Sequence, residues 1–389
     1  MVSPLKLRLY RLKTKITRII FVLSVLYFPF SLNCAQSPKY IRVAIIQDAS
    51  YFRLKIKGFY EVIGSADNRV LYRGKNLNTT VTAYKWGILL GKIKYGAHKL
   101  FIKPSDPDAL LIDGRKFRGD IQFIKKDNLK ILVINYIDLD DYIKGILYHE
   151  ASHYWPQEAL KAQAIVCRTY SVYQMQENKF KDFDVTSDIY SQVYGGMTSE
   201  RYRTNKAVDD TTGYILNYKG EIFPAYYHAT CAGNTEDASL LWNIDIVPLK
   251  GVTCGFCKDS PHFSWHYVLS ADDVQDKLVN AGYKINNIKD IVILGRDKSG
   301  RITDLQIQFG EEEIKIPAKD FRNIIGPNII RSTNFTVNVV KGDVVFEGFG
   351  WGHGVGFCQW GAYFMAKAGY KYDEILKFYY PGTELSLIQ

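Results

Sequence analysis

The spacing of apolar residues changes near residue 136, and this change constrains the fold more than any other feature of the sequence. Before it, segments such as Phe52–Lys57 alternate apolar and polar residues, which is typical of half-buried strands. After it, apolar residues from Tyr142 to Leu147 recur at helical spacing behind Asp138, a residue that favours a helix start. Strand patterns return between residues 290 and 346. The pattern predicts an α+β protein.

The same pattern divides the chain into three regions. We expect a leading segment at 1–35, a β-rich N-terminal lobe at 36–135, and a mixed α/β region at 136–389. Within the mixed region, a first helix ends near Glu150, and Pro156 opens a second helix as its first residue. A glycine-rich loop at 348–356 then leads into a C-terminal helix.

The first 35 residues have the layout of an export signal. Six basic residues lie within the first eighteen positions, and the apolar run Ile19–Phe28 follows them. This run is short for a bilayer span, which needs roughly 20 residues. Cleavage after Ala35, an uncleaved anchor and lipid attachment at Cys34 are the three open alternatives. All three predict an exported protein of the cell envelope that contacts a membrane only through this segment.

The charge of the chain excludes one class of partner. The formal net charge is +10, but no basic run has interleaved aromatic residues, so nucleic acid is not an expected partner. Much of the excess positive charge lies in the leading segment. The mildly basic remainder suits an anionic polymer, and it is equally typical of an ordinary solvated surface.

Two long motifs carry a family resemblance. Tyr142–Tyr170 reads YIKGILYHEASHYWPQEALKAQAIVCRTY, and Gly348–Ala362 reads GFGWGHGVGFCQWGA. Both resemble signatures of the stage II sporulation protein D / LytB family, in the right order. The stretches around Tyr194 and Tyr227 also resemble family segments, and the similarity runs from about residue 135 to the end.

The resemblance implies a cell-wall function. Enzymes of this family are lytic transglycosylases that cut peptidoglycan between N-acetylmuramic acid and N-acetylglucosamine, favour strands without stem peptides and leave anhydromuramic acid ends. It assigns the catalytic acid to Glu150, although Ala151 stands where the family usually has Met. The alternative is a non-catalytic, glycan-binding enhancer of an N-acetylmuramoyl-L-alanine amidase, which would make that amidase a partner.

Elementary chemistry supports the same acid. Glycoside cleavage needs a proton on the leaving oxygen, so the acid must stay protonated near neutral pH. Glu150 stands at the C-terminal end of the expected helix, where the helix dipole disfavours a carboxylate. A cleft lined by Tyr154 and Trp155 would desolvate it further, whereas a protonated His149 would oppose both effects.

Further substrate-binding candidates lie in both motifs. We expect Arg168 and Tyr170 to face the glycan, and His353 to orient the acid or bind a sugar. Gln359 supplies an amide and Trp360 an apolar platform. Each of these residues also has a purely structural interpretation, as a packing or loop-stabilising side chain.

The cysteines suggest a structural metal. Cys254 and Cys257 form a C-x-x-C pair, with His228 and Cys231 upstream. Four such ligands fit a closed tetrahedral zinc site, and some members of the family bind zinc. A disulfide, which an exported protein would permit, and reduced core thiols are the alternatives.

Overall fold

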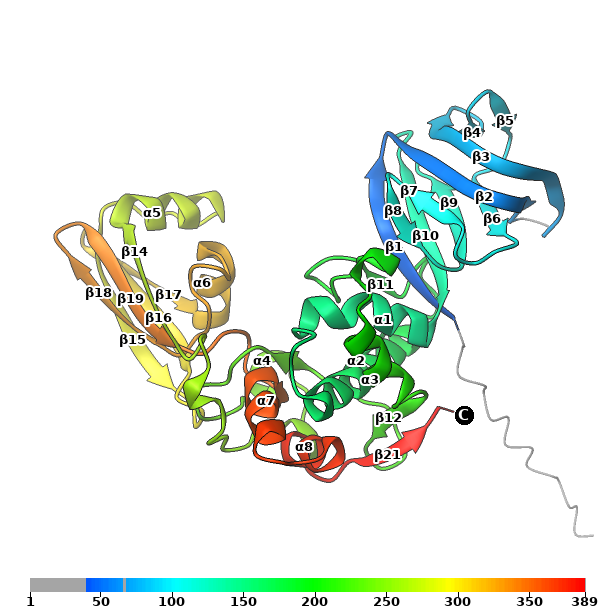
Figure 1. Cartoon of the computed structure of the whole chain (residues 1–389). Coiled ribbons are helices and arrows are strands. Elements are labelled where there is room, and N and C mark those ends of the chain that lie inside the picture. The colour runs from blue at the N-terminus through cyan, green and yellow to red at the C-terminus, as the bar shows by residue number, and fades with distance from the viewer. Residues whose placement is uncertain (1–39, 66–67, 389) are drawn as a thin grey trace, which may run out of the picture. The chain divides into compact units, whose positions relative to one another are not determined.

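The computed structural model describes residues 40–65 and 68–388, and the predicted export segment lies outside them. Strands and helices are both abundant, so the predicted α+β class is confirmed. The described residues contain no helix that combines the length and the apolar character needed to cross a bilayer. Figure 1 shows the strands β1 to β10 gathered together at the start of the described chain, with helices following them.

One large sheet contains these early strands. Its strand order is β11-β1-β10-β9-β6-β2-β3-β4-β5; β7 also pairs with β2, and β8 pairs with β7. The strands are β1 (Tyr40–Ala49), β2 (Tyr51–Gly64), β3 (Val70–Tyr84), β4 (Gly87–Leu90), β5 (Ile93–Tyr95), β6 (Lys99–Pro104), β7 (Leu110–Ile112), β8 (Arg115–Phe117), β9 (Asp120–Lys125), β10 (Ile131–Asp138) and β11 (Val185–Thr186). In β2 the predicted alternation is confirmed, because Phe52, Leu54 and Ile56 are buried while the basic residues between them are exposed.

Three helices follow the sheet and carry the first motif. They are α1 (Leu139–Glu150), α2 (Gln157–Glu177) and α3 (Tyr202–Asp209). The carboxylate of Asp138 caps α1 by accepting a hydrogen bond from the backbone N–H of Asp140 at 3.0 Å. Pro156 is the N-cap residue of α2, so this helix begins one residue later than the sequence predicted. The side of α1 that includes Tyr142 and Ile146 packs into the same core as the sheet.

A second group of strands forms around residues 264–349. Its elements are β14 (Ser264–Ser270), α5 (Ala271–Asn280), β15 (Ile288–Arg296), β16 (Ile302–Phe309), β17 (Glu312–Pro317), α6 (Ala318–Ile325), β18 (Phe335–Val340) and β19 (Asp343–Phe349). They make two three-stranded sheets, ordered β14-β19-β18 and β15-β16-β17. A separate apolar core, which includes Trp265 and Phe346, lies among them. This confirms the strands expected after residue 290.

Short elements from distant segments of the sequence meet around the second motif. They are β12 (Tyr214–Asn217), β13 (Tyr227–His228), α4 (Ala238–Trp242), β20 (Phe357–Cys358), α7 (Gln359–Lys367), α8 (Tyr372–Tyr379) and β21 (Glu384–Leu387). β13 pairs in parallel with β20, and β12 pairs with β21. The glycine-rich loop does lead into a helix, as predicted, since α7 begins directly after β20. This pairing brings Tyr227 and the loop together.

Candidate functional site

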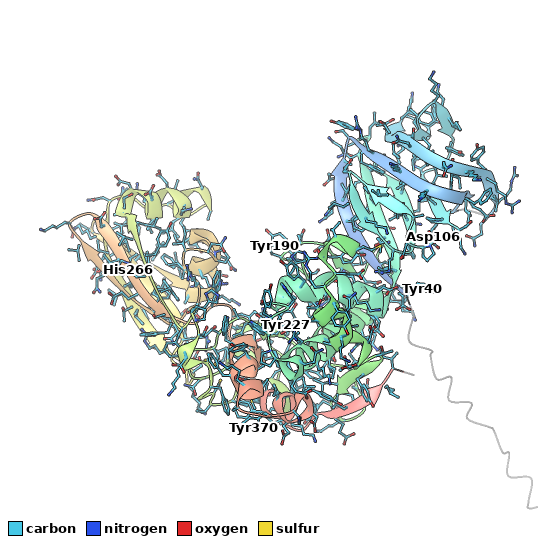
Figure 2. All side chains as sticks on the ribbon, viewed as in Figure 1. Tyr40, Asp106, Tyr190, Tyr227, His266 and Tyr370 are labelled. Carbon is cyan, nitrogen blue, oxygen red and sulfur yellow. The ribbon has the colours of Figure 1, made fainter. Side chains whose placement is uncertain are left out.

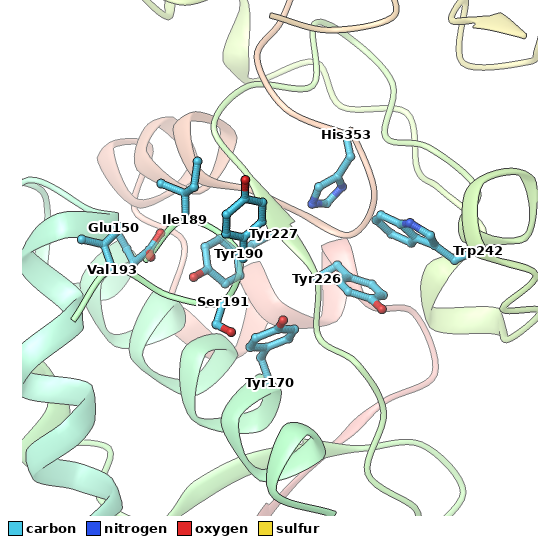
Figure 3. Close-up of a pocket in the computed structure, with 10 residues that line it drawn as sticks. All are labelled: Glu150, Tyr170, Ile189, Tyr190, Ser191, Val193, Tyr226, Tyr227, Trp242 and His353. Atoms are coloured by element: carbon cyan, nitrogen blue, oxygen red, sulfur yellow. The ribbon is translucent and has the colours of Figure 1, made fainter. Parts of the chain in front are cut away.

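A pocket of about 380 Å³ lies between the two motifs. Its lining residues are Glu150, Tyr170, Ile189, Tyr190, Ser191, Val193, Tyr226, Tyr227, Trp242 and His353. Figure 3 shows Glu150 and Val193 at one side of the pocket and His353 and Trp242 at the other. Tyr190, from a turn, and Tyr227, from β13, both lie close to the helical part of the chain (Figure 2). Aromatic rings make most of the wall, and Glu150 is the one carboxylic acid among these described lining residues.

Glu150 is the last residue of α1, and its carboxyl group faces the pocket. Burial raises the pKa of this carboxyl from 4.5 to about 7. Three hydrogen bonds oppose that rise because they favour the carboxylate: one from the Tyr227 hydroxyl, one from the backbone N–H of Val193 and one from the Gln359 amide. The balance leaves a large protonated fraction near neutral pH, as a general acid requires.

The neighbours that bury Glu150 differ from those predicted. Tyr154 is 80% exposed and is not among the pocket's lining residues. Trp155 also lies outside the lining and packs on Trp360, with ring centroids 5.1 Å apart. Both belong to the turn that leads away from the helix end, so their rings cannot desolvate the acid from inside the pocket. Val193 and Tyr227, from two later segments, do so instead.

His149 does not place a positive charge beside the acid. Burial, and then the Arg201 guanidinium, lower the pKa of His149 below 6.5, which favours the neutral ring. Its Nε2 lies 2.6 Å from the Ser199 hydroxyl. The opposing effect expected from a protonated His149 is therefore weak near neutral pH.

The Tyr227 side chain is held in place through Gln192. Gln192 donates from Nε2 to the Tyr227 hydroxyl at 3.3 Å. The other end of Gln192 accepts from the hydroxyls of Tyr142 at 3.2 Å and Ser171 at 2.9 Å. Because the amide orientation is fixed by these two donors, the Tyr227 hydroxyl accepts from Gln192 and directs its own proton at Glu150. Three later segments of the chain, which carry Val193, Tyr227 and Gln359, thus meet at the acid.

His353 closes the opposite side of the pocket. Its Nδ1 accepts a hydrogen bond from the backbone N–H of Val355 at 3.0 Å, so the neutral ring carries its proton on Nε2. Burial, followed by the positive charges of Arg322 and Arg301, lowers the pKa of His353 to about 3. The ring is therefore neutral and is not a proton donor of ordinary acidity. It can donate a hydrogen bond or pack against a sugar.

Two glycines let the loop around His353 pack closely against His228 and Arg301. Gly352 has φ +113° and Gly354 has φ +89°, a region that other residues rarely adopt. A Cβ on Gly354 would lie 2.4 Å from Cζ of Arg301, whose guanidinium is buried and donates to the carbonyls of Asn234 and Cys231. The glycine-rich composition follows from this packing.

The remaining predicted site residues fall into different environments. Tyr170 lines the pocket together with His353. Gln359 donates from Nε2 to the backbone carbonyl of Glu150 at 3.0 Å. Arg168 is fully buried and pairs with Asp140, so the expectation that it faces a glycan does not agree with its position. Its nearest partners are protein groups, including the carbonyl of Tyr214 at 3.0 Å.

Several lining residues were not singled out from the sequence. Tyr190 and Tyr226 come from irregular segments, and Trp242 ends the short helix α4. Tyr226 packs on Trp242, with ring centroids 4.4 Å apart. A usable signal existed for Val193 and Tyr227, because both lie in stretches that resemble the family.

Four buried cysteines form a cluster that could hold a metal. The Sγ atoms of Cys231, Cys254, Cys257 and Cys358 all lie within 4.8 Å of one another. All four are free thiols, and the Sγ atoms of Cys231 and Cys257 are 3.4 Å apart, too far for a disulfide bond. Zn–S bonds of about 2.3 Å in a tetrahedron fit sulfurs spaced in this range.

The cluster differs from the predicted ligand set in one member. The sequence favoured His228 beside the three earlier cysteines, but Cys358 occupies that place. The His228 ring faces the glycine-rich loop instead and donates from Nδ1 to the carbonyl of Val355 at 3.1 Å. The pairing of β13 with β20 places His228 opposite Cys358. Of these two side chains, the cysteine is the one that belongs to the cluster.

Fold and pocket together define an α+β protein with a single-acid, aromatic-walled pocket beside a four-cysteine cluster. The chain belongs to the stage II sporulation protein D family. A family model described as "Stage II sporulation protein" matches residues 127–218, which include α1 and α2. A second model, described as a domain of unknown function, matches residues 251–356.

Relatives match along most of the chain. An uncharacterised protein of Brachyspira hyodysenteriae is 33% identical over 347 residues, which cover 89% of this chain and 92% of that protein. The amidase enhancer of Bacillus subtilis is 28% identical over 82% of this chain, and the match spans 51% of the enhancer's length. Stage II sporulation protein D of Bacillus subtilis is 29% identical, with 64% of this chain and 75% of the relative covered.

Proposed function

We propose that this protein is a lytic transglycosylase that cleaves peptidoglycan glycan strands between N-acetylmuramic acid and N-acetylglucosamine, with Glu150 as acid and then base. The observation that carries the proposal is the single carboxylic acid in the described pocket lining, whose pKa is raised to about 7. A hydrolase of the usual kind needs a second carboxylate to activate water or to attack the sugar. A lytic transglycosylase does not, because the substrate supplies its own nucleophile.

One side chain, Glu150, can carry out both proton transfers of the reaction. Protonated Glu150 gives its proton to the glycosidic oxygen as the bond to C1 of the muramic acid breaks. The C6 hydroxyl of the same sugar then bonds to C1, and the Glu150 carboxylate takes the proton that this hydroxyl releases. The products are an anhydromuramic acid end and a free 4-hydroxyl on the neighbouring sugar, and no water is consumed. Glu150 finishes protonated and ready for another cycle.

The surrounding side chains suit both halves of this cycle. The Tyr227 hydroxyl and the Gln359 amide stabilise the carboxylate form, which exists between the two proton transfers. Neutral His353 adds no charge that would lock Glu150 in its ionised form. Tyr170, Tyr226 and Trp242 offer apolar faces for sugar rings and exclude water from the positively charged sugar intermediate.

We further propose that the cysteine cluster binds a structural zinc ion. A closed set of four buried thiolates leaves no open position for substrate, so the ion would stabilise the fold and would not take part in the reaction. Backbone N–H groups already point at one sulfur: Cys231 and Gly361 donate to Sγ of Cys358 at 3.3 and 3.4 Å. Such donors favour thiolate ligands.

A second candidate function rests on the similarity to a protein named amidase enhancer. In that case the pocket would bind glycan without cleaving it, and the chain would stimulate an N-acetylmuramoyl-L-alanine amidase as its partner. Either function requires contact with peptidoglycan. We therefore also propose that the protein is exported and acts in the cell envelope, in line with the basic and apolar leading segment.

A digest distinguishes the two functions. Peptidoglycan without stem peptides is incubated with the purified protein or with its Glu150→Gln variant, and the products are identified by mass spectrometry. Anhydromuramic acid ends from the native protein, and none from the variant, are expected. Reducing ends would reject the transglycosylase in favour of a hydrolase. Glycan binding without cleavage by either protein would favour the enhancer.

A further inference from the structure

A row of partly exposed side chains, mostly aromatic rings, begins beside the Glu150 segment and lies outside the pocket lining. Its rings, in order of contact, are Trp155, Trp360, His262 and Trp351, and the Arg331 guanidinium ends it; we refer to these five residues as the aromatic row. Ring centroids are 5.1 Å apart for Trp155 and Trp360, 6.0 Å for Trp360 and His262, and 4.8 Å for His262 and Trp351. None of the five lines the pocket.

The row ends in the Arg331 guanidinium, which has no acidic partner within the part of the chain that the structure describes. The Arg331 guanidinium lies over the Trp351 ring, 4.6 Å from its centroid. Among the described residues Arg331 forms no ion pair with a carboxylate, and its backbone carbonyl is what accepts from Arg322 and Gly352. An arginine that is fixed on a ring and free of carboxylate partners is suited to bind a carboxylate of another molecule.

The other end of the row is similar. Trp155 also contacts Tyr363, with centroids 5.3 Å apart, and the Lys367 ammonium lies 5.6 Å from the centroid of that ring. Lys367 too has no ion pair with any residue that the structure describes. Aromatic faces thus lie between two cations, a pattern that matches a polymer with apolar sugar faces and regularly spaced carboxylates.

The row is not simply a stretch of core. Trp155, Trp360, His262 and Trp351 are all half-buried, so each ring keeps some of its surface in solvent. A contiguous set of partly exposed large rings is unusual unless another molecule covers it. Burial, followed by the charge of Arg331, lowers the pKa of His262, which keeps this ring neutral and its apolar character intact.

We propose that the aromatic row is a second glycan-binding surface, separate from the pocket, that holds strands bearing the carboxylates of muramic acid. This inference rests on the proposed function for its ligand class but not on cleavage. The backbone of Glu150 adjoins the row, because Gln359, the residue before Trp360, donates to its carbonyl. Binding at the row would keep the protein on the polymer between cleavage events.

The test measures binding in the absence of cleavage. Sedimentation with insoluble, peptide-stripped peptidoglycan is followed in the Glu150→Gln background, with and without the double substitution Trp351→Ala and Arg331→Ala. We expect the double substitution to raise the apparent Kd about tenfold or more, and we expect the remaining binding to depend less on salt. Trp86→Ala is the matched control, since Trp86 is an exposed tryptophan with the Lys85 ammonium 4.7 Å from its ring centroid, far along the sequence from the row.

The outcomes separate the two proposals. Unchanged binding by the double variant, or equal weakening by Trp86→Ala, would contradict the proposal that the aromatic row binds glycan. Trp351→Phe with Arg331→Lys keeps a ring and a charge and should restore some of the affinity, which excludes simple unfolding as the cause. Cleavage of short glycan fragments by the double variant with Glu150 intact should stay within about twofold of the native rate. Absence of cleavage in the native protein would reject the proposed reaction and leave the binding result standing.

Discussion

The side-chain amide of Gln359 donates a hydrogen bond to the backbone carbonyl of Glu150 at 3.0 Å, across 209 positions of sequence. This contact joins the end of α1 to the start of α7, and so joins the two motifs. It also satisfies a carbonyl at the C-terminal end of a helix, where backbone acceptors lack partners within the helix. The acid is therefore positioned by the second motif as well as by its own helix.

The first prediction concerns the pH dependence of cleavage. The acid form of Glu150 starts the reaction and its pKa is about 7, so kcat/KM should fall as pH rises above that value. In Tyr227→Phe the carboxylate loses a hydrogen-bond donor, which raises the pKa of Glu150 further. The falling limb of the pH–rate profile should then move to higher pH.

Tyr170→Phe is the control for this prediction. Tyr170 lines the same pocket but is not among the groups that donate a hydrogen bond to Glu150. Its loss should leave the position of the limb unchanged, whatever it does to KM. A limb that stays in place in Tyr227→Phe, or that moves equally in both variants, would show that the Tyr227 hydroxyl does not act on the acid.

The same shift predicts a pH-dependent stability. The folded pKa of Glu150, about 7, lies above its ordinary value of 4.5, so the folded protein holds this proton more tightly than the unfolded chain. The stability that depends on the protonated carboxyl is fully present below pH 4.5 and is lost as pH rises through 7. Glu150→Gln is always neutral and escapes that loss.

Chemical denaturation at two pH values tests this second prediction. The Glu150→Gln variant should be more stable than the native protein at pH 8, and the difference should shrink at pH 5. Because all other titrating groups are common to both proteins, comparing the two differences removes their contribution. A difference that is the same at both pH values would mean that Glu150 ionises as an ordinary exposed carboxyl.

The third prediction separates structural from substrate-binding roles in the first motif. The Arg168 side chain is fully buried and its guanidinium pairs with Asp140, which is 20% exposed. Arg168→Met removes one partner of a buried pair and should lower the free energy of unfolding by about 3–5 kcal/mol. The exposed pair of Lys206 with Asp210 provides the comparison, and Lys206→Met should cost less than about 1 kcal/mol. A KM that rises severalfold while stability is unchanged would instead assign Arg168 to the glycan.

Much of the fold could be predicted because its signals are local. The alternation in β2, the Asp138 cap and the helical spacing of α1 all act within a few residues, and each was interpreted correctly. The placement of Glu150 at the end of α1 followed directly from them. Local patterns of this kind indicate elements, but they do not show which elements meet.

The pocket wall and the fourth cysteine could not be predicted for that reason. Tyr226 directly precedes β13, which pairs in parallel with β20, and both are two-residue strands that leave no alternation to recognise. Trp242 comes from the end of the short helix α4. Cys358 lies next to the glycine-rich loop in sequence, more than a hundred residues after Cys231. The pairing of Arg168 with Asp140 could not be predicted either, because Asp140 lies on another helix and helical spacing alone does not distinguish a buried ion pair from a ligand contact.

The last prediction distinguishes the two possible zinc ligand sets. If the cluster in the structure holds the ion, Cys358→Ala should lower the bound zinc from about one per chain to near zero, whereas His228→Ala should keep it, because His228 directs Nδ1 at the carbonyl of Val355. Metal content by plasma mass spectrometry and release of zinc to a colorimetric chelator give independent readings. Cys167→Ala is the control for loss of a buried thiol, since Cys167 lies outside the cluster and contacts Gln163.

Zinc lost in His228→Ala and retained in Cys358→Ala would restore the ligand set expected from the sequence. Absence of zinc in the native protein, with all four thiols still reactive after unfolding, would mean that the cluster is a group of reduced core thiols. The N–H groups of Cys231 and Gly361 would then donate to a neutral thiol of Cys358 and not to a thiolate.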